Sequence, residues 1–147
     1  MPSDAFLMPP WRVDARVGAL MTTRAGGVST APFHSFNLGR SAGDEPAAVD
    51  ENRRRFEAAL GVPTRYLKQV HGAGVVRLTH DSPGPHTADA AITTEPGLAC
   101  TVMVADCLPV LFAAPGGRGV AAAHAGWRGL AAAVLEATVG ALCDAAA

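Results

Sequence analysis

Three apolar, β-prone runs in the second half of the chain constrain its fold most strongly. They cover residues 98–105, 108–114 and 119–125, and the turn-forming stretches 106–107 and 115–117 separate them. Short continuous apolar runs bounded by turn residues are typical of buried strands. The sequence therefore predicts that the core of a sheet lies in this part of the chain.

Two other segments have the pattern of helices that cover such a sheet. Residues 46–60 begin with Pro46, which suits a first helical turn, repeat apolar residues at helical spacing and stop before Gly61. From Gly129 onward strong helix formers dominate, with leucine and valine at helix-compatible intervals. Shorter strands are expected at residues 17–22, 66–70 and 74–79. The predicted fold class is α/β.

Chain length and charge exclude several classes of protein. With 147 residues the chain supports one ordinary hydrophobic core, so we expect a single domain over residues 1–147. The formal net charge of -1 gives no basic field for nucleic acid or anionic membranes. No secretory signal and no apolar run of about 18 residues is found, so we expect no membrane span. The balanced charge favours a small-molecule partner instead. Three cysteines are an odd, sparse set, which indicates a reducing, cytoplasmic location.

Three side chains are the strongest candidates for a chemical site. His71, Cys107 and His124 each follow a short β-prone stretch, and strand ends bring side chains together. Zinc accepts mixed imidazole and thiolate ligands, and a three-ligand site leaves a fourth position for water. The spacing is not that of a zinc finger, so a core cysteine with two structural histidines stays open as an alternative.

Several short motifs, taken together, resemble those of one family. They are Leu67-Lys-Gln-Val-His-Gly72, Ala88-Asp-Ala90, Ala105-Asp-Cys-Leu-Pro-Val110 and Ala123-His-Ala-Gly-Trp-Arg-Gly129, preceded by Arg24-Ala-Gly-Gly-Val-Ser29, Phe36-Asn-Leu-Gly39, Gly43-Asp44 and Asn52-Arg53. In this order they resemble the YfiH-type family, once called laccase-domain or multicopper polyphenol oxidase proteins and now regarded as purine nucleoside phosphorylases. The resemblance runs over residues 24–142.

This resemblance implies a metal site, a fold and a substrate class. The family's zinc ligands correspond here to His71, Cys107 and His124, and its fold is a mixed α/β arrangement with sheet layers covered by helices. The implied activities are zinc-dependent phosphorolysis of adenosine, inosine, guanosine and methylthioadenosine, and deamination of adenosine. Purine nucleosides and phosphate are then the expected partners. Family members are usually longer, so we expect this chain to lack the family's C-terminal portion.

Other residues in the motifs are candidates for substrate contact and proton transfer. Arg128, beside His124, is the leading candidate for holding phosphate, because a guanidinium presents a planar pair of donors. Asp106 and Asp89 could each orient a histidine or carry a proton, although a carboxylate that caps backbone amides is an equal alternative for Asp89. The catalytic candidates are His71, Cys107, His124, Arg128 and Asp106, and the substrate-binding candidates are Arg24, Asn37, Arg53, Gln69 and Asp89.

Three other residues are expected to serve packing alone. Trp127 should pack the start of the following helix, and Cys100 and Cys143 should be small core residues.

Three other functions compete with the nucleoside phosphorylase. A copper polyphenol oxidase could use the same ligands, but the chain has only five histidines and no His-x-His pair for a multinuclear copper cluster. A cysteine hydrolase would use Cys107 as nucleophile and His124 as base, without metal. A non-enzymatic remnant would bind metal without turnover.

Overall fold

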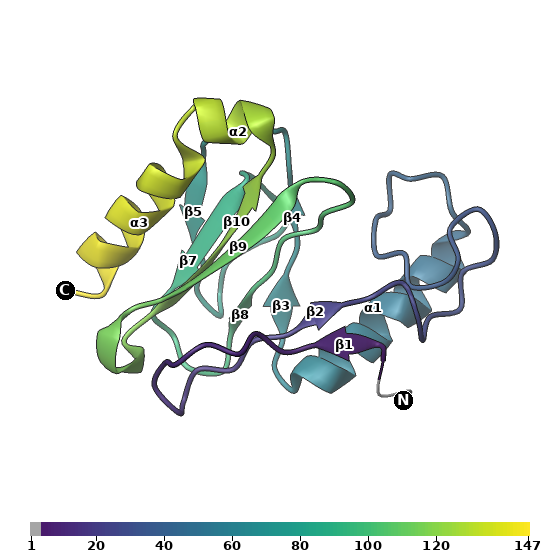
Figure 1. The fold of residues 1–147 in the computed structure, drawn as a ribbon, viewed down its shortest axis with the longest axis horizontal. Helices are drawn as coiled ribbons and strands as arrows, with labels where there is room; N and C mark the ends of the chain where they lie inside the picture. The colour runs from purple at the N-terminus through teal and green to yellow at the C-terminus, as the bar shows by residue number, and fades with distance from the viewer. Residues whose placement is uncertain (1–3) are drawn as a thin grey trace. The chain divides into compact units, whose positions relative to one another are not determined.

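The computed structural model describes residues 4–147, which fall into two compact units (Figure 1). The described part of the first unit comprises residues 4–12 and Gly18–Val62, and the second unit comprises Val13–Val17 and Pro63–Ala147. That these units form a single domain stays a prediction. Among the described residues, no helix has the length and apolar character needed to cross a bilayer.

The first unit contains one long helix and one short strand pair. Helix α1 spans Pro46–Leu60, as predicted, and ends where Gly61 adopts a left-handed backbone with φ 78°. Strand β1 (Phe6–Leu7) pairs antiparallel with β2 (Met21–Thr22). The predicted strand over residues 17–22 is therefore reduced to its last two residues.

The second unit is built on a four-stranded mixed sheet in the order β5-β7-β10-β9. Strand β5 (Val75–Arg77) runs parallel to β7 (Ala90–Thr93), whereas β10 (Val120–Ala125) is antiparallel to both β7 and β9 (Leu108–Ala113). Two short parallel pairs add β3 (Thr64–Arg65) with β8 (Ala99–Cys100), and β4 (Leu67–Lys68) with β6 (His86–Thr87). A 3-10 turn, η1, covers Pro115–Gly117.

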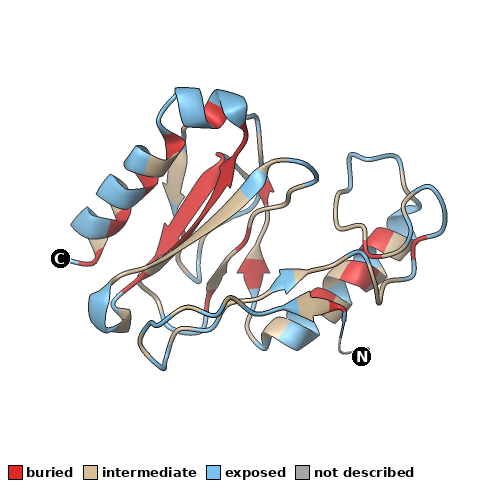
Figure 2. Cartoon of the chain, viewed as in Figure 1, coloured by how far each residue is buried: buried red, intermediate tan, exposed pale blue. Residues whose placement is uncertain are grey.

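Helices α2 (Trp127–Ala131) and α3 (Val134–Ala145) follow the sheet. Val134 and Leu142 of α3 pack against small side chains of β7 and β10, and Figure 1 shows α3 lying along that side of the sheet. The two α3 residues belong to two clusters on this face, and a third cluster, which includes Ala91, packs separately, so the sheet separates two apolar layers. Both central strands are buried almost throughout (Figure 2). The predicted α/β class with a mixed sheet and covering helices is confirmed.

Three details of the predicted elements are wrong. Strand β7, at the centre of the sheet, was not expected. The C-terminal helix is interrupted at Ala133, which has a left-handed backbone with φ 64°. The run 98–105 forms a strand only at Ala99–Cys100, because beyond it the side-chain amide of Gln69 takes the place of a neighbouring strand. Its Nε2 donates to the Met103 carbonyl (2.7 Å), and its Oε1 accepts from the Met103 N–H (2.8 Å).

Candidate metal centre

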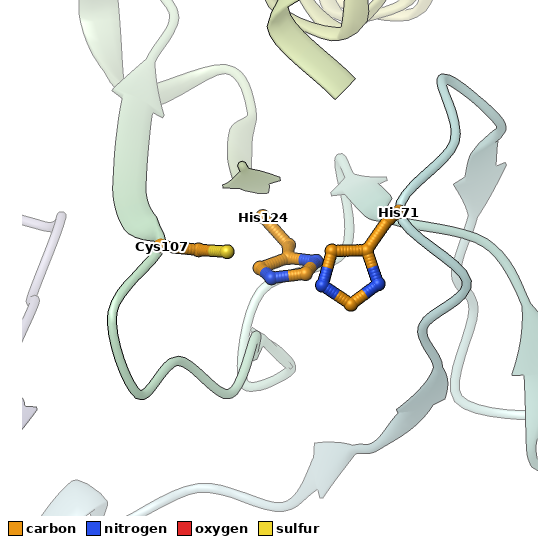
Figure 3. A group of neighbouring side chains, drawn as sticks. All are labelled: His71, Cys107 and His124. Carbon is orange, nitrogen blue, oxygen red and sulfur yellow. The ribbon is translucent and has the colours of Figure 1, made fainter. Parts of the chain in front are cut away.

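His71, Cys107 and His124 converge at one end of the sheet in the second unit. His124 lies in β10, Cys107 directly precedes β9, and His71 lies in the bend after β4. Because Ala125 pairs with Leu108 across β10 and β9, the end of one strand meets the start of the other, and Cys107 is brought beside His124. One potential ligand atom from each side chain lies within 4.8 Å of the other two. Figure 3 shows the three side chains pointing toward one another.

One buried carboxylate, that of Asp89, contacts both the ring of His124 and the backbone of the turn that carries His71. Asp89 Oδ2 lies 2.8 Å from His124 Nδ1, and the two side chains are 0% and 5% exposed. The backbone N–H groups of Val70, His71 and Gly72 each donate to Asp89 at 2.9 Å. These bonds close the turn in which His71 has the unusual φ of 60°. The rings of His71 and His124 meet edge to face, with centroids 4.8 Å apart.

Burial and hydrogen bonding shift the pKa of Asp89 in opposite directions. Burial alone would raise the pKa of Asp89, but the bonds from His124 and the three backbone amides together lower this pKa below its usual value. The carboxylate is therefore kept ionised as an acceptor for all four donors.

The thiol of Cys107 is in a different electrostatic setting. Burial raises the pKa of Cys107, and the negative charges of Asp106 and Asp89 raise it further. Catalytic cysteines without a metal need the opposite shift, since the thiolate is the nucleophile. This environment argues against the cysteine-hydrolase alternative. A bound metal ion would itself supply the positive charge that deprotonates a ligating thiol.

Gly126 provides the space that the Cys107 sulfur occupies. A Cβ built on Gly126 would lie 2.7 Å from Cys107 Sγ and 3.4 Å from His71 Cδ2. The backbone at Gly126 has φ -80° and ψ 175°, which any residue adopts, so space and not conformation requires glycine here. The sequence analysis missed Gly126 as a site residue, although its place two residues after His124 in a matched motif was a usable signal.

The donor set fits one zinc ion. Zinc binds imidazole nitrogen at about 2.0–2.1 Å and thiolate sulfur at about 2.3 Å, so ligand atoms around one tetrahedral ion lie roughly 3.3–3.6 Å apart. The three potential ligand atoms lie within 4.8 Å of one another, so they need to approach by about an ångström to bind one ion. Small side-chain rotations allow such an approach. His124 Nδ1 is already bonded to Asp89, so Nε2 is the atom that remains for a metal.

The other predicted residues of the second unit have varied surroundings. Asp106 is exposed in the bend before Cys107, and Arg128 is exposed in α2 with its guanidinium 4.8 Å from the centre of the Trp127 ring. The amide of Gln69 is bonded to the Met103 backbone, as described above.

The predicted substrate residues of the first unit hydrogen bond within that unit. Arg24 donates to the carbonyl of His34, Arg53 to the carbonyl of Leu38, and Asn37 to the carboxylate of Asp44. These bonds keep the three side chains in defined positions, and their role in substrate binding stays a prediction.

Two expectations about packing are wrong. Trp127 is 73% exposed, because Gly129 and not Trp127 is the buried residue of α2. Cys143 is exposed on α3, whereas Cys100 is half-buried against a core cluster.

The fold and the three converging side chains define an α/β protein with a candidate site for one metal ion. Residues 18–147 match the profile of a family described as multi-copper polyphenol oxidoreductase laccase, and the chain belongs to this family.

Similar proteins agree with the resemblance read from the motifs. The chain is 55% identical over 139 residues to "Purine nucleoside phosphorylase PA4543" of Pseudomonas aeruginosa, covering 95% of this chain and 57% of that protein. It is 49% identical over 141 residues to "Purine nucleoside phosphorylase YfiH" of Escherichia coli, covering 95% and 58%. The crystal structure of NMB0706 from Neisseria meningitidis, a DUF152 protein, superposes with a TM-score of 0.90 at 47% identity, covering 94% and 57%. The YfiH-type resemblance is thus confirmed, and the chain spans less than two thirds of these relatives.

Proposed function

We propose that this chain binds one zinc ion through His71, Cys107 and His124, and that it acts on purine nucleosides. The proposed reactions are phosphorolysis of adenosine, inosine, guanosine and methylthioadenosine, and deamination of adenosine. The observation that carries the proposal is the convergence of two imidazoles and one thiol within 4.8 Å. The printed names of the relatives, which are purine nucleoside phosphorylases, supply the substrate class.

The number of potential ligands favours zinc over a multinuclear copper cluster. Multinuclear copper chemistry needs several metal sites close together, whereas residues 4–147 hold one group of three potential ligands. When bound, zinc would supply Lewis-acid chemistry and water activation at neutral pH, which the deamination requires. Three free cysteines also fit a reducing compartment, and we propose a cytoplasmic location.

The surroundings of the metal ligands suit a nucleoside. Val70, Leu108 and Trp127 are 54%, 60% and 73% exposed, and Val70 and Leu108 directly adjoin His71 and Cys107 in the chain. Exposed apolar side chains beside a polar site offer surface for a purine ring to stack on.

Arg128 is the proposed phosphate ligand. Its guanidinium carbon lies over the Trp127 ring, 4.8 Å from the ring centre, and a guanidinium held in this way can still donate its N–H groups to phosphate oxygens. In the phosphorolysis a phosphate oxygen bonds to the anomeric carbon while the bond to the purine nitrogen breaks, and the purine leaves with a proton. Asp106, exposed beside Cys107, is the proposed carrier of that proton. Gln69 is a further proposed substrate contact, and substrate binding by Arg24, Asn37 and Arg53 of the first unit stays a prediction.

Metal analysis tests the binding half of this proposal. Protein purified without chelator should carry about one zinc per chain, as a three-ligand site of this type does. Cys107→Ala and His124→Ala should lose this zinc, while Cys143→Ala, which removes an exposed thiol on α3, should keep it. Copper as the only bound metal, or equal metal loss in all three variants, would refute the site.

A chromatographic assay tests the catalytic half. Adenosine with phosphate should yield adenine and ribose 1-phosphate, and adenosine in water should yield inosine. Arg128→Ala should reduce phosphorolysis more than deamination, and Arg54→Ala, which changes an exposed arginine of α1 paired with Glu51, should alter neither. If zinc-loaded chain forms neither product above a metal-free control, the enzymatic proposal fails and the non-enzymatic alternative holds.

A further inference from the structure

Asp89 has a position that neither substrate contact nor proton transfer explains. It directly precedes β7 and is fully buried, with 0% of its surface exposed. Its two oxygens share four donors. Oδ1 accepts from the N–H groups of Val70 and Gly72, and Oδ2 accepts from the His71 N–H and lies against His124 Nδ1. A carboxylate without exposed surface and with this many bonds is not available to a substrate.

The contact with His124 selects one form of its ring. Oδ2 already receives the His71 N–H and can only accept from His124, so Nδ1 must carry the hydrogen. The Nε2 lone pair then remains free in the ring edge that a metal would approach. The backbone supports the same arrangement, because the His124 N–H donates to the Asp89 carbonyl at 2.7 Å.

Asp89 contacts His71 through the backbone and not through the imidazole ring. Three successive N–H groups, from Val70 to Gly72, point at one carboxylate, which is the geometry of an anion-binding nest. This arrangement holds His71 at φ 60°, a conformation that is unfavourable for a residue with a Cβ. Without the carboxylate, the N–H groups lose their acceptor and the turn loses the bonds that offset this cost.

We propose that Asp89 is a positioning residue that forms the metal site before any metal binds, by fixing the tautomer of His124 and the turn of His71 together. This inference rests on the proposed metal-binding function, although the state of the His124 ring in metal-free protein can be measured independently of it. Two ligands from segments far apart in the sequence thus depend on one side chain.

The first test is the tautomer of His124 in the metal-free wild-type protein. Nitrogen-15 NMR at mildly alkaline pH, where an ordinary imidazole is neutral, should show the hydrogen on Nδ1. A ring with its hydrogen on Nε2 would overturn the proposal without any substitution being made.

The second test uses Asp89→Asn, which keeps the side-chain shape. Its amide can present oxygen to Val70 and Gly72, but its NH2 group would then face the His71 N–H and His124 Nδ1. The hydrogen of His124 should move to Nε2, and zinc affinity, measured by competition with a chromogenic chelator, should fall about 10- to 100-fold. Retained affinity with the wild-type tautomer would overturn the proposal.

Asp106→Asn is the matched comparison, because it removes a nearby carboxylate that is exposed and whose hydrogen bond is to Cys107 and not to a histidine ring. It should leave the tautomer on Nδ1 and change zinc affinity less than Asp89→Asn does. If both variants lost the same zinc affinity, the negative charge of Asp89 alone would explain its effect. That result would overturn its positioning role. A wild-type protein with the Nδ1 hydrogen that binds no zinc would instead refute the proposed function and leave the tautomer selection by Asp89 standing.

Discussion

Replacement of Gly126 by alanine tests whether the space beside Cys107 is required for the metal site. The added Cβ would lie 2.7 Å from Cys107 Sγ, about an ångström inside an ordinary carbon–sulfur contact. Overpacking of this kind costs about 1–3 kcal/mol when the neighbour cannot move. The backbone of Gly126 is already in the extended region, so alanine adds no backbone strain.

The cost should fall on metal binding in particular. Cys107 can relieve the clash by rotating its sulfur, and we expect this rotation to move the sulfur out of the position in which it faces the two histidines. A penalty of about 1–3 kcal/mol corresponds to a loss of zinc affinity of about 5- to 150-fold. Chelator competition measures this loss, and Gly140→Ala, at a glycine with open space around the new Cβ, is the control that should leave affinity unchanged.

A double substitution separates this clash from other effects. In the Cys107→Ala background the nearest remaining atom of residue 107 is its Cβ, 3.8 Å away, an ordinary contact. Gly126→Ala should therefore cost less unfolding free energy in that background than in wild type, as urea denaturation of the metal-free proteins would show. Unchanged stability together with full zinc affinity in the single variant would refute the reasoning.

Two further predictions concern stability. Asn52 is fully buried and bonds to Val28 N, Ser29 Oγ and Asn37 O at 2.9 Å each. Asn52→Ala should cost about 1–3 kcal/mol, because the part-buried Val28 N–H and Asn37 carbonyl lose this partner. Urea denaturation measures this cost, and Asn52→Asp should not rescue it because a carboxylate would face the Asn37 carbonyl. Gly61→Ala should destabilise by about 1 kcal/mol because Gly61 has φ 78°, whereas Gly140→Ala in α3 should stabilise by about 0.5–1 kcal/mol. Melting temperatures that shift in the same direction for these two glycines would contradict the argument.

Elements with local sequence signals were predicted well. Helix α1 has Pro46 in its first turn and Gly61 after its last residue, and both boundaries were predicted from these residues alone. Strands β9 and β10 follow continuous apolar runs and were placed to within one residue. In each case the residues that define the element lie inside it or directly beside it.

Elements that depend on distant contacts were not predicted. Strand β7 has only four residues, and its central place comes from pairing with β5 and β10. The helix break at Ala133 lies in an alanine-rich stretch with no glycine or proline to mark it. The loop after β8 is apolar, and it leaves the strand conformation because Gln69, 34 residues away, supplies its hydrogen bonds.

The candidate site depends on the same long-range register, which explains why spacing alone indicated it only weakly. Ala121, Ala123 and Ala125 of β10 pack in the clusters that include α3, so the alternate residue His124 faces the opposite side of the sheet. Pairing of Ala123 with Ala90 places His124 next to Asp89. A slip of one residue in this pairing would turn His124 toward α3 and separate it from Asp89. The alanines of β10 therefore contribute to the site without touching a ligand, because their burial against α3 fixes the register that brings the histidine and the carboxylate together.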